Sequence, residues 1–71
     1  MPLLLAELNV DYTIKHISAN EKDRHYLESL GFIPGTRLCV VSKFNGYFLV
    51  NIKDSRIGIS KDLAKRIILS E

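Results

Sequence analysis

The residues whose types and spacing come nearest to a metal site lie on one predicted helix. Glu21, His25 and Glu28 are spaced i, i+4 and i+7, so on a helix they line one face. An imidazole and two carboxylates could together hold a divalent ion. The outer face of a surface helix is normally charged, however, and this face needs no metal to explain it. We therefore predict no metal site and no cofactor.

The residue types that serve as nucleophiles also lack a catalytic setting. Cys39, the one cysteine, lies in the apolar run from Leu38 to Val41, where a cysteine usually behaves as a small buried hydrophobe. His16 has no acidic or cysteine neighbour in sequence and is interpreted as an ordinary strand residue. The sequence contains no Cys-x-x-Cys, no phosphate-binding glycine loop and no nucleophile elbow. We predict that the chain is not an enzyme.

Basic and aromatic residues near the middle of the chain suggest a different chemistry. Small barrels that bind single-stranded nucleic acid combine stacking aromatics with a basic groove, and the residues that could do so here are Lys43, Tyr47, Phe48, Lys53 and Arg56. Strand alternation predicts that Phe48 points inward, which leaves only Tyr47 for stacking. Nucleic-acid binding is therefore the alternative function, and no nucleic acid is expected as the main partner.

Length, charge and cysteine content narrow the class of protein. A chain of 71 residues with 46% hydrophobic and 25% charged residues predicts one small globular domain over residues 1–71. The net charge is +2, with three basic and five acidic side chains through Gly35 and seven basic and three acidic ones after it. One cysteine allows no internal disulfide, which favours the reducing cytoplasm. The apolar run from Met1 to Ala6 is too short for a signal sequence or a membrane span.

The elements that position these residues are organised around the end of the one long helix, predicted over residues 20–29. Gly31 follows it as a left-handed C-cap, and Phe32 is then expected to contact Leu27 in a Schellman motif. Pro34 and Gly35 supply the central pair of a type II turn. The helix start has two possible caps, Ser18 in a capping box with Glu21 or Asn20 with Asp23.

Short strands account for most of the remaining chain. Asn45-Gly46 is a strong signal for a type I′ hairpin, and it places Phe48, Val50 and Ile52 on one face of the returning strand. Ser60 can cap a helical turn that precedes the last strand. The patterns predict five strands, over residues 12–17, 37–44, 47–52, 56–60 and 67–69. We therefore predict a mainly β fold, a small closed barrel with one short α-helix and a short helical turn.

Three local expectations complete this prediction. The leucines of the first eight residues should pack against the body, since four exposed leucines would form an aggregation-prone patch. Asn9 or Asp11 should take the backbone geometry of a turn before the first strand. Gly58, inside a predicted strand, indicates a bulge or a close crossing.

Two stretches, in this order, resemble the FeoA family. The first is Leu27-x-x-Leu30-Gly31-x-x-Pro34-Gly35-Thr36 followed by an apolar strand, and the second runs from Arg56 to Ile67. The resemblance implies an SH3-like barrel and a non-enzymatic role in bacterial ferrous iron uptake. It also implies a protein partner, FeoB, a membrane transporter with a cytosolic GTP-binding domain, through which the chain would meet the membrane only indirectly.

The candidate partner-binding residues come from the helix and the hairpin. Tyr26, Leu27 and Leu30 form a narrow apolar stripe on the helix, and in so small a domain one of them should remain partly exposed. Tyr26 is the best candidate, because its hydroxyl needs water or a partner and tyrosine is favoured at interface hot spots. Tyr47 is the fourth candidate.

Overall fold

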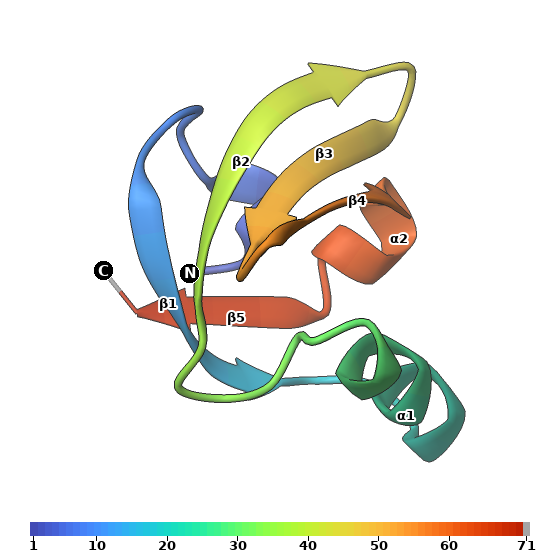
Figure 1. The fold of residues 1–71 in the computed structure, drawn as a ribbon. Helices are drawn as coiled ribbons and strands as arrows, with labels where there is room; N and C mark the ends of the chain where they lie inside the picture. Colours follow the sequence, from blue (N-terminus) through green and yellow to red (C-terminus); the bar gives the residue numbers. More distant parts are fainter. Residues whose placement is uncertain (71) are drawn as a thin grey trace.

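Five antiparallel strands form one sheet in the computed structural model, which describes residues 1–70. Their order across the sheet is β4-β3-β2-β1-β5. The strands are β1 (Asp11–Ile17), β2 (Arg37–Phe44), β3 (Tyr47–Ile52), β4 (Ser55–Ser60) and β5 (Ile67–Ser70). The curved strand β2 connects the β3–β4 part of the sheet to the β1–β5 part (Figure 1). The predicted strands are all confirmed, with ends that differ by one residue at most.

Three short helical segments accompany the sheet. These are the 3₁₀ turn η1 (Leu3–Leu5), the helix α1 (Glu21–Ser29) and the four-residue helix α2 (Lys61–Ala64). Helix α1 lies at one end of the molecule, and the turn between β2 and β3 lies at the other (Figure 1). Of residues 1–70, no helical stretch has the length and apolar character that crossing a membrane requires.

The end of α1 forms the predicted Schellman motif. Gly31 has a φ of 105°, its N–H donates to the carbonyl oxygen of Glu28 at 3.0 Å, and the N–H of Phe32 donates to that of Leu27 at 3.0 Å. Leu27 and Phe32 are both fully buried. Gly35 has a φ of 92°, and the N–H of Thr36 donates to the carbonyl of Ile33, as the predicted type II turn requires. These turns direct the chain from α1 into β2.

The start of α1 uses the second of the two predicted caps. The backbone N–H of Asp23 donates to Oδ1 of Asn20 at 2.7 Å. The capping box at Ser18 is therefore wrong, because Ser18 stands two residues before the N-cap. The shorter helix α2 begins as predicted, since the N–H of Leu63 donates to Oγ of Ser60 at 3.3 Å.

The hairpin between β2 and β3 is also as predicted. Asn45 has a φ of 48° and Gly46 one of 76°, which are the positive values that a type I′ turn needs. Phe44 pairs with Tyr47 across the turn. This register directs Phe48, and every second residue after it on β3, into the core.

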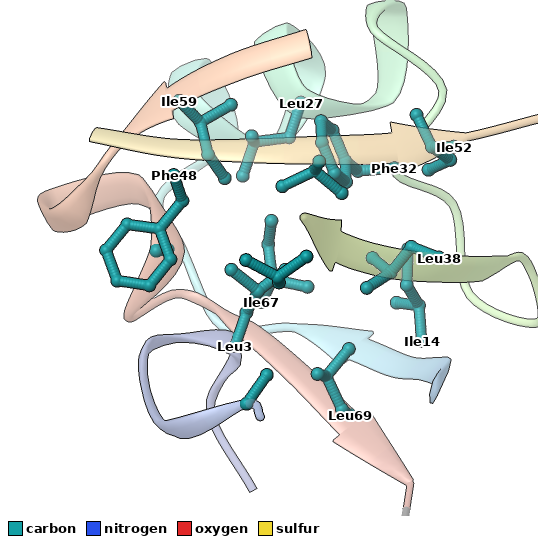
Figure 2. Packing of buried hydrophobic residues seen from close by; sticks show 14 of the residues in the cluster. Leu3, Ile14, Leu27, Phe32, Leu38, Phe48, Ile52, Ile59, Ile67 and Leu69 are labelled. Carbon is teal, nitrogen blue, oxygen red and sulfur yellow. The ribbon is translucent and has the colours of Figure 1, made fainter. Parts of the chain in front are cut away.

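The core consists of apolar side chains from every element of the fold (Figure 2). Each large one that is fully buried contributes roughly 1.5–3 kcal/mol relative to an exposed side chain. Its largest fully buried members are Leu3, Ile14, Leu27, Phe32, Val40, Val50, Ile52, Ile67 and Leu69. Only Leu27 from α1 is fully buried, so the helix joins the core through its last turn and the segment that follows it.

Two expectations are corrected by the structure. Leu3 is buried, but Leu5 is 66% exposed, because the 3₁₀ turn presents only part of its circumference to the core. Leu8, in the turn before β1, is also exposed. Gly58 is not at a bulge, since β3 and β4 pair in continuous register. The register shifts lie instead between Ile14 and His16 and between Val40 and Ser42. The turn before β1 is as expected, with Asn9 at a φ of 63°.

The two edges of the sheet differ in whether other residues cover them. At the β5 edge, the N–H of Leu69 donates to the carbonyl of Met1 at 2.6 Å, and Pro2 forms a bridge with Ile68. At the β4 edge, within residues 1–70, the backbone from Arg56 to Ile59 makes no hydrogen bond beyond its pairing with β3. One edge is therefore covered by the first residues of the chain, and the other is open. Since β4 and β5 do not pair in the described part of the chain, the barrel is not closed by hydrogen bonds as the sequence predicted.

Candidate functional site

The four predicted partner-binding residues separate into two groups. Leu27 is fully buried and presents no side-chain surface to a partner. Leu30 is half-buried against the core, and Tyr26 is 52% exposed, so Tyr26 is the exposed member of the helix stripe. Tyr47 lies on β3 beside the hairpin turn, at the end of the molecule opposite α1 (Figure 1). The structure therefore contains two candidate surfaces, and we call Tyr26 and Leu30 the helix surface.

The second surface is a groove at the hairpin. Phe44 is 72% exposed and Tyr47 is 61% exposed, although both are large aromatic residues. They adjoin a hollow of about 530 Å³, which we call the hairpin groove. Its lining residues come from three adjacent strands and the turn, and they are Ser42, Phe44, Asn45, Tyr47, Phe48, Leu49 and Gly58.

The register of the sheet explains the shape of this groove. Ser42 pairs with Leu49, and Leu49 pairs with Gly58, so these three residues form one row across β2, β3 and β4. On the same face of the sheet, two residues nearer the turn, Phe44 pairs with Tyr47. Because Gly58 has no side chain, the row is hollow at the open edge of the sheet. The groove is thus bordered by aromatic rings at the turn.

Basic residues lie on the elements next to the hairpin groove, although none of them is among its lining residues. Nζ of Lys43 lies 5.4 Å from the ring centroid of Phe48, a cation–π distance. Arg56, two residues before Gly58 on β4, donates from Nε to Oδ1 of Asn51 at 2.8 Å. The N–H of Lys61 donates to the carbonyl of Gly46, which places the start of α2 at the hairpin turn. From Arg37 to Ala64 the chain has five basic and two acidic side chains.

The helix surface has a different electrostatic character. From Glu21 to Ser29 the chain has three acidic and two basic side chains. Glu21, His25 and Glu28, the residues with metal-ligand spacing, are all exposed. Across residues 1–70, no three His, Cys, Asp or Glu side chains are grouped closely enough to hold a metal ion.

A second hollow, of about 550 Å³, lies beside β1, β2 and β3. Its lining includes Cys39, which is only half-buried, contrary to the sequence expectation of a buried cysteine. Arg37 and Asp11 form an exposed ion pair there at 3.5 Å. Of residues 1–70, no histidine and no second cysteine line this hollow beside Cys39.

Phe44 is the residue that the sequence interpretation missed. In the sequence it is the last residue of an apolar run that predicts a strand. The Asn45-Gly46 turn pairs it with Tyr47, and since Phe48 points inward, both Phe44 and Tyr47 must point outward. The signal was thus present in the alternation that placed Phe48 in the core.

Comparisons with known proteins address family and fold. The family model described as the FeoA domain matches residues 1–71. No curated protein matches the chain. The order and spacing of the glycine-containing motifs therefore gave the family correctly.

Solved structures match nearly the whole chain. A crystal structure of an iron uptake regulatory protein, FeoA, is 24% identical with a TM-score of 0.90, covering 97% of this chain and 93% of the other. FeoA of Stenotrophomonas maltophilia, crystallised with zinc and described as a procaryotic SH3 domain protein, is 24% identical with a TM-score of 0.87, covering 99% and 89%. A manganese-dependent transcriptional repressor is 24% identical with a TM-score of 0.88, covering 100% of this chain but 41% of the repressor. The SH3-like fold predicted from the sequence is confirmed.

Proposed function

The chain belongs to the FeoA family, and we propose that it is a non-enzymatic accessory protein of bacterial ferrous iron uptake. In this proposal it binds the cytosolic part of a FeoB-like GTP-binding membrane transporter. It acts in the cytoplasm as one domain and reaches the membrane only through that partner. Family membership supports the link to ferrous iron transport. The solved FeoA proteins are themselves described in terms of iron uptake and of activating ferrous iron transport.

The observation that carries the proposed mode of action is the exposure of large aromatic residues. Phe44 and Tyr47 are mostly in solvent and flank a groove, and Tyr26 is half exposed at the other end of the molecule. Contiguous exposed apolar side chains on a small protein mark interaction sites, and aromatic residues dominate interface hot spots. Their placement supports a protein that works by binding another protein.

Titration calorimetry of the 71-residue chain against the purified cytosolic GTP-binding domain of a FeoB-like transporter from the same organism tests this proposal. We expect saturable binding. Because the two surfaces lie at opposite ends of the molecule, single variants test them separately. Tyr26→Ala removes the exposed side chain of the helix surface, and Phe44→Ser removes an exposed aromatic side chain of the hairpin groove. Absence of binding by the unaltered chain, with GTP or GDP present, would overturn the proposal.

Nucleic-acid binding is the second candidate function. The observation that favours it is the pair of exposed aromatic residues, Phe44 and Tyr47, on a hairpin that also carries Lys43, because aromatic rings can stack with bases. Fluorescence anisotropy with a labelled oligothymidylate tests it. Binding that weakens steeply with salt and is lost in Tyr47→Ala would support this function.

A further inference from the structure

We infer that the hairpin groove and the open edge of β4 bind an extended acidic peptide segment of the partner protein, with an apolar side chain of that segment seated over Gly58. The inference rests on the proposed function and specifies its surface and ligand chemistry. Four observations support it, and they concern Gly58, the sheet edge, the aromatic residues and the charge.

Gly58 is a glycine that the fold itself does not require. Its φ is outside the positive region, so its backbone conformation is open to other residues. A Cβ atom built on it would meet no heavy atom within 4 Å, so no neighbour in the chain crowds the first atom of a side chain there. Glycine inside a strand is otherwise unfavourable, and it often marks a place where a ligand or another backbone approaches closely. The space above Gly58 is part of the hairpin groove.

The adjacent sheet edge is available to an extended chain. Proteins usually cover or block the edges of their sheets, since an open edge offers unpaired N–H and C=O groups. This protein covers the β5 edge with Met1 and Pro2, yet β4 carries no such cover in the part of the chain that the structure describes. An extended peptide can add to such an edge through main-chain hydrogen bonds, while pockets select its side chains. The hairpin groove lies beside this edge, at Gly58.

The aromatic residues at the turn add a surface for anchoring. Phe44 and Tyr47 pair across the hairpin and remain more exposed than any other aromatic residue of residues 1–70. The partly buried Leu49 lies in the groove between these rings and Gly58. The lining of the groove is therefore mainly apolar at this point. An aliphatic or aromatic side chain fits this lining better than a charged one.

The charge of the region selects an acidic partner and disfavours a second copy of this chain. Three basic residues, Lys43, Arg56 and Lys61, lie on the strands β2 and β4 and at the start of α2, next to the groove. Between Arg37 and Ala64 the chain has two acidic residues, and one of them, Asp62, is paired with Lys65 at 3.5 Å. Two copies joined at their β4 edges would bring like charges together, whereas an acidic segment would be attracted. A single strand of nucleic acid is also acidic, but its phosphodiester backbone has no N–H donors to alternate with its acceptors, as a strand edge requires.

A pair of designed peptides provides the test. The acidic probe is an acetylated octapeptide with a central Phe-Val pair flanked on each side by three glutamates, and the basic probe replaces each glutamate with lysine. NMR spectra of the ¹⁵N-labelled chain are recorded during titration with each probe and with oligothymidylate. We expect the acidic probe alone to shift the amide signals of Tyr47, Leu49 and Gly58, with an effect that falls as salt is raised.

Three variants localise the binding. Gly58→Thr fills the groove with a residue that strands favour, so it should melt at or above the temperature of the unaltered chain while its Kd for the acidic probe rises roughly ten-fold or more. Phe44→Ser should weaken binding similarly. Leu5→Ser is the matched control, because Leu5 is about as exposed as Phe44 but lies outside the groove, and it should bind as the unaltered chain does.

The outcomes separate this inference from the proposed function. It is overturned if the acidic probe leaves these signals unchanged, if the basic probe binds equally well, if oligothymidylate binds there instead, or if Gly58→Thr binds normally. If the transporter domain binds the unaltered chain and Gly58→Thr equally, the inference fails and the proposed function stands. If the acidic probe binds as expected and the transporter domain does not bind, the groove is assigned correctly and the transporter is the wrong partner.

Discussion

One end of the molecule carries α1 and the other carries the turn between β2 and β3, and they differ in how many of their distinctive residues the fold buries or hydrogen-bonds. At the helix end, nearly every distinctive residue is engaged by the fold: Leu27 and Phe32 are buried, Gly31 closes the helix, and Asn20 caps it. At the hairpin end, the turn is equally well formed, but two aromatic rings remain in solvent beside an open sheet edge. The difference shows that a regular fold can be complete while some of its residues remain unexplained by packing.

This contrast suggests where function lies. Substituting a residue that is buried or hydrogen-bonded in the fold changes the free energy of unfolding. Substituting an exposed residue at an interaction site changes the affinity for a partner instead. The two ends also differ in charge, since the helix has more acidic than basic residues and the hairpin region has more basic than acidic ones. Paired substitutions at the two ends therefore test the contrast directly.

The largest expected difference is between two phenylalanines. Phe32→Ala removes a fully buried ring and should cost roughly 3–5 kcal/mol of unfolding free energy. A domain of this size has a total stability of only about 4–10 kcal/mol, so the variant should be largely destabilised. Phe44→Ala removes a ring that is mostly in solvent and should change stability by less than about 0.5 kcal/mol. Urea melts of both variants measure this, and equal losses would contradict the contrast.

Two glycines provide the next comparison. Gly31→Val should cost roughly 1–3 kcal/mol, because a β-branched residue is strained at a φ of 105°. No heavy atom lies within 4 Å of a Cβ built at Gly31, so we expect the backbone to account for most of the cost. Gly58→Thr, at a position without positive φ, should be neutral or stabilising. Chemical denaturation is the measurement, and an unchanged midpoint for Gly31→Val would mean that this C-cap is not strained.

Tyr26 tests whether the helix surface shares in partner binding. Tyr26→Ala should leave the fold intact, since the ring is half exposed, and should weaken association with the transporter domain by roughly 1–2 kcal/mol. Calorimetric titration, with a thermal melt of the variant alongside, provides both readings. Equal binding by the variant would remove Tyr26 from the interface and leave the hairpin groove as the one candidate, whereas a collapsed melt would return Tyr26 to the core.

The smallest expected effect concerns the start of α1. Asn20→Ala should cost about 1 kcal/mol, because it removes the side-chain acceptor for the N–H of Asp23. Ser18→Ala should cost almost nothing, since Ser18 is exposed and does not cap the helix. Thermal melts of the two variants separate the caps. A larger loss for Ser18→Ala would show that the capping box forms in solution.

Local sequence signals predicted most of the fold because each one has a backbone cause. Gly31, Gly35 and Asn45-Gly46 stand where positive φ values are needed, and all of them adopt such values. Alternation on β3 placed its core residues correctly. The bulges in β1 and β2 were not predicted, because a register shift depends on how two strands pair and leaves no mark in either strand alone.

The candidate site was predicted less well. Tyr26 and Tyr47 were selected and are exposed, but Leu27 was selected too and is fully buried, since the narrow stripe of α1 could not show which member enters the core. Phe44 was overlooked because an apolar residue at a strand end is ambiguous until its cross-strand partner is placed. Gly58 was interpreted as a bulge or a close crossing. Its actual setting depends on the open edge of β4, which is a property of the whole sheet.

The most direct test of the central claim is a calorimetric titration of the cytosolic GTP-binding domain of a FeoB-like transporter with the unaltered chain, Phe44→Ser and the control Leu5→Ser. The account predicts saturable binding by the unaltered chain and by Leu5→Ser, and binding that is weaker by about ten-fold or more for Phe44→Ser. Binding that is identical for all three proteins would contradict a role for the hairpin groove, and no binding by the unaltered chain would contradict the proposed function.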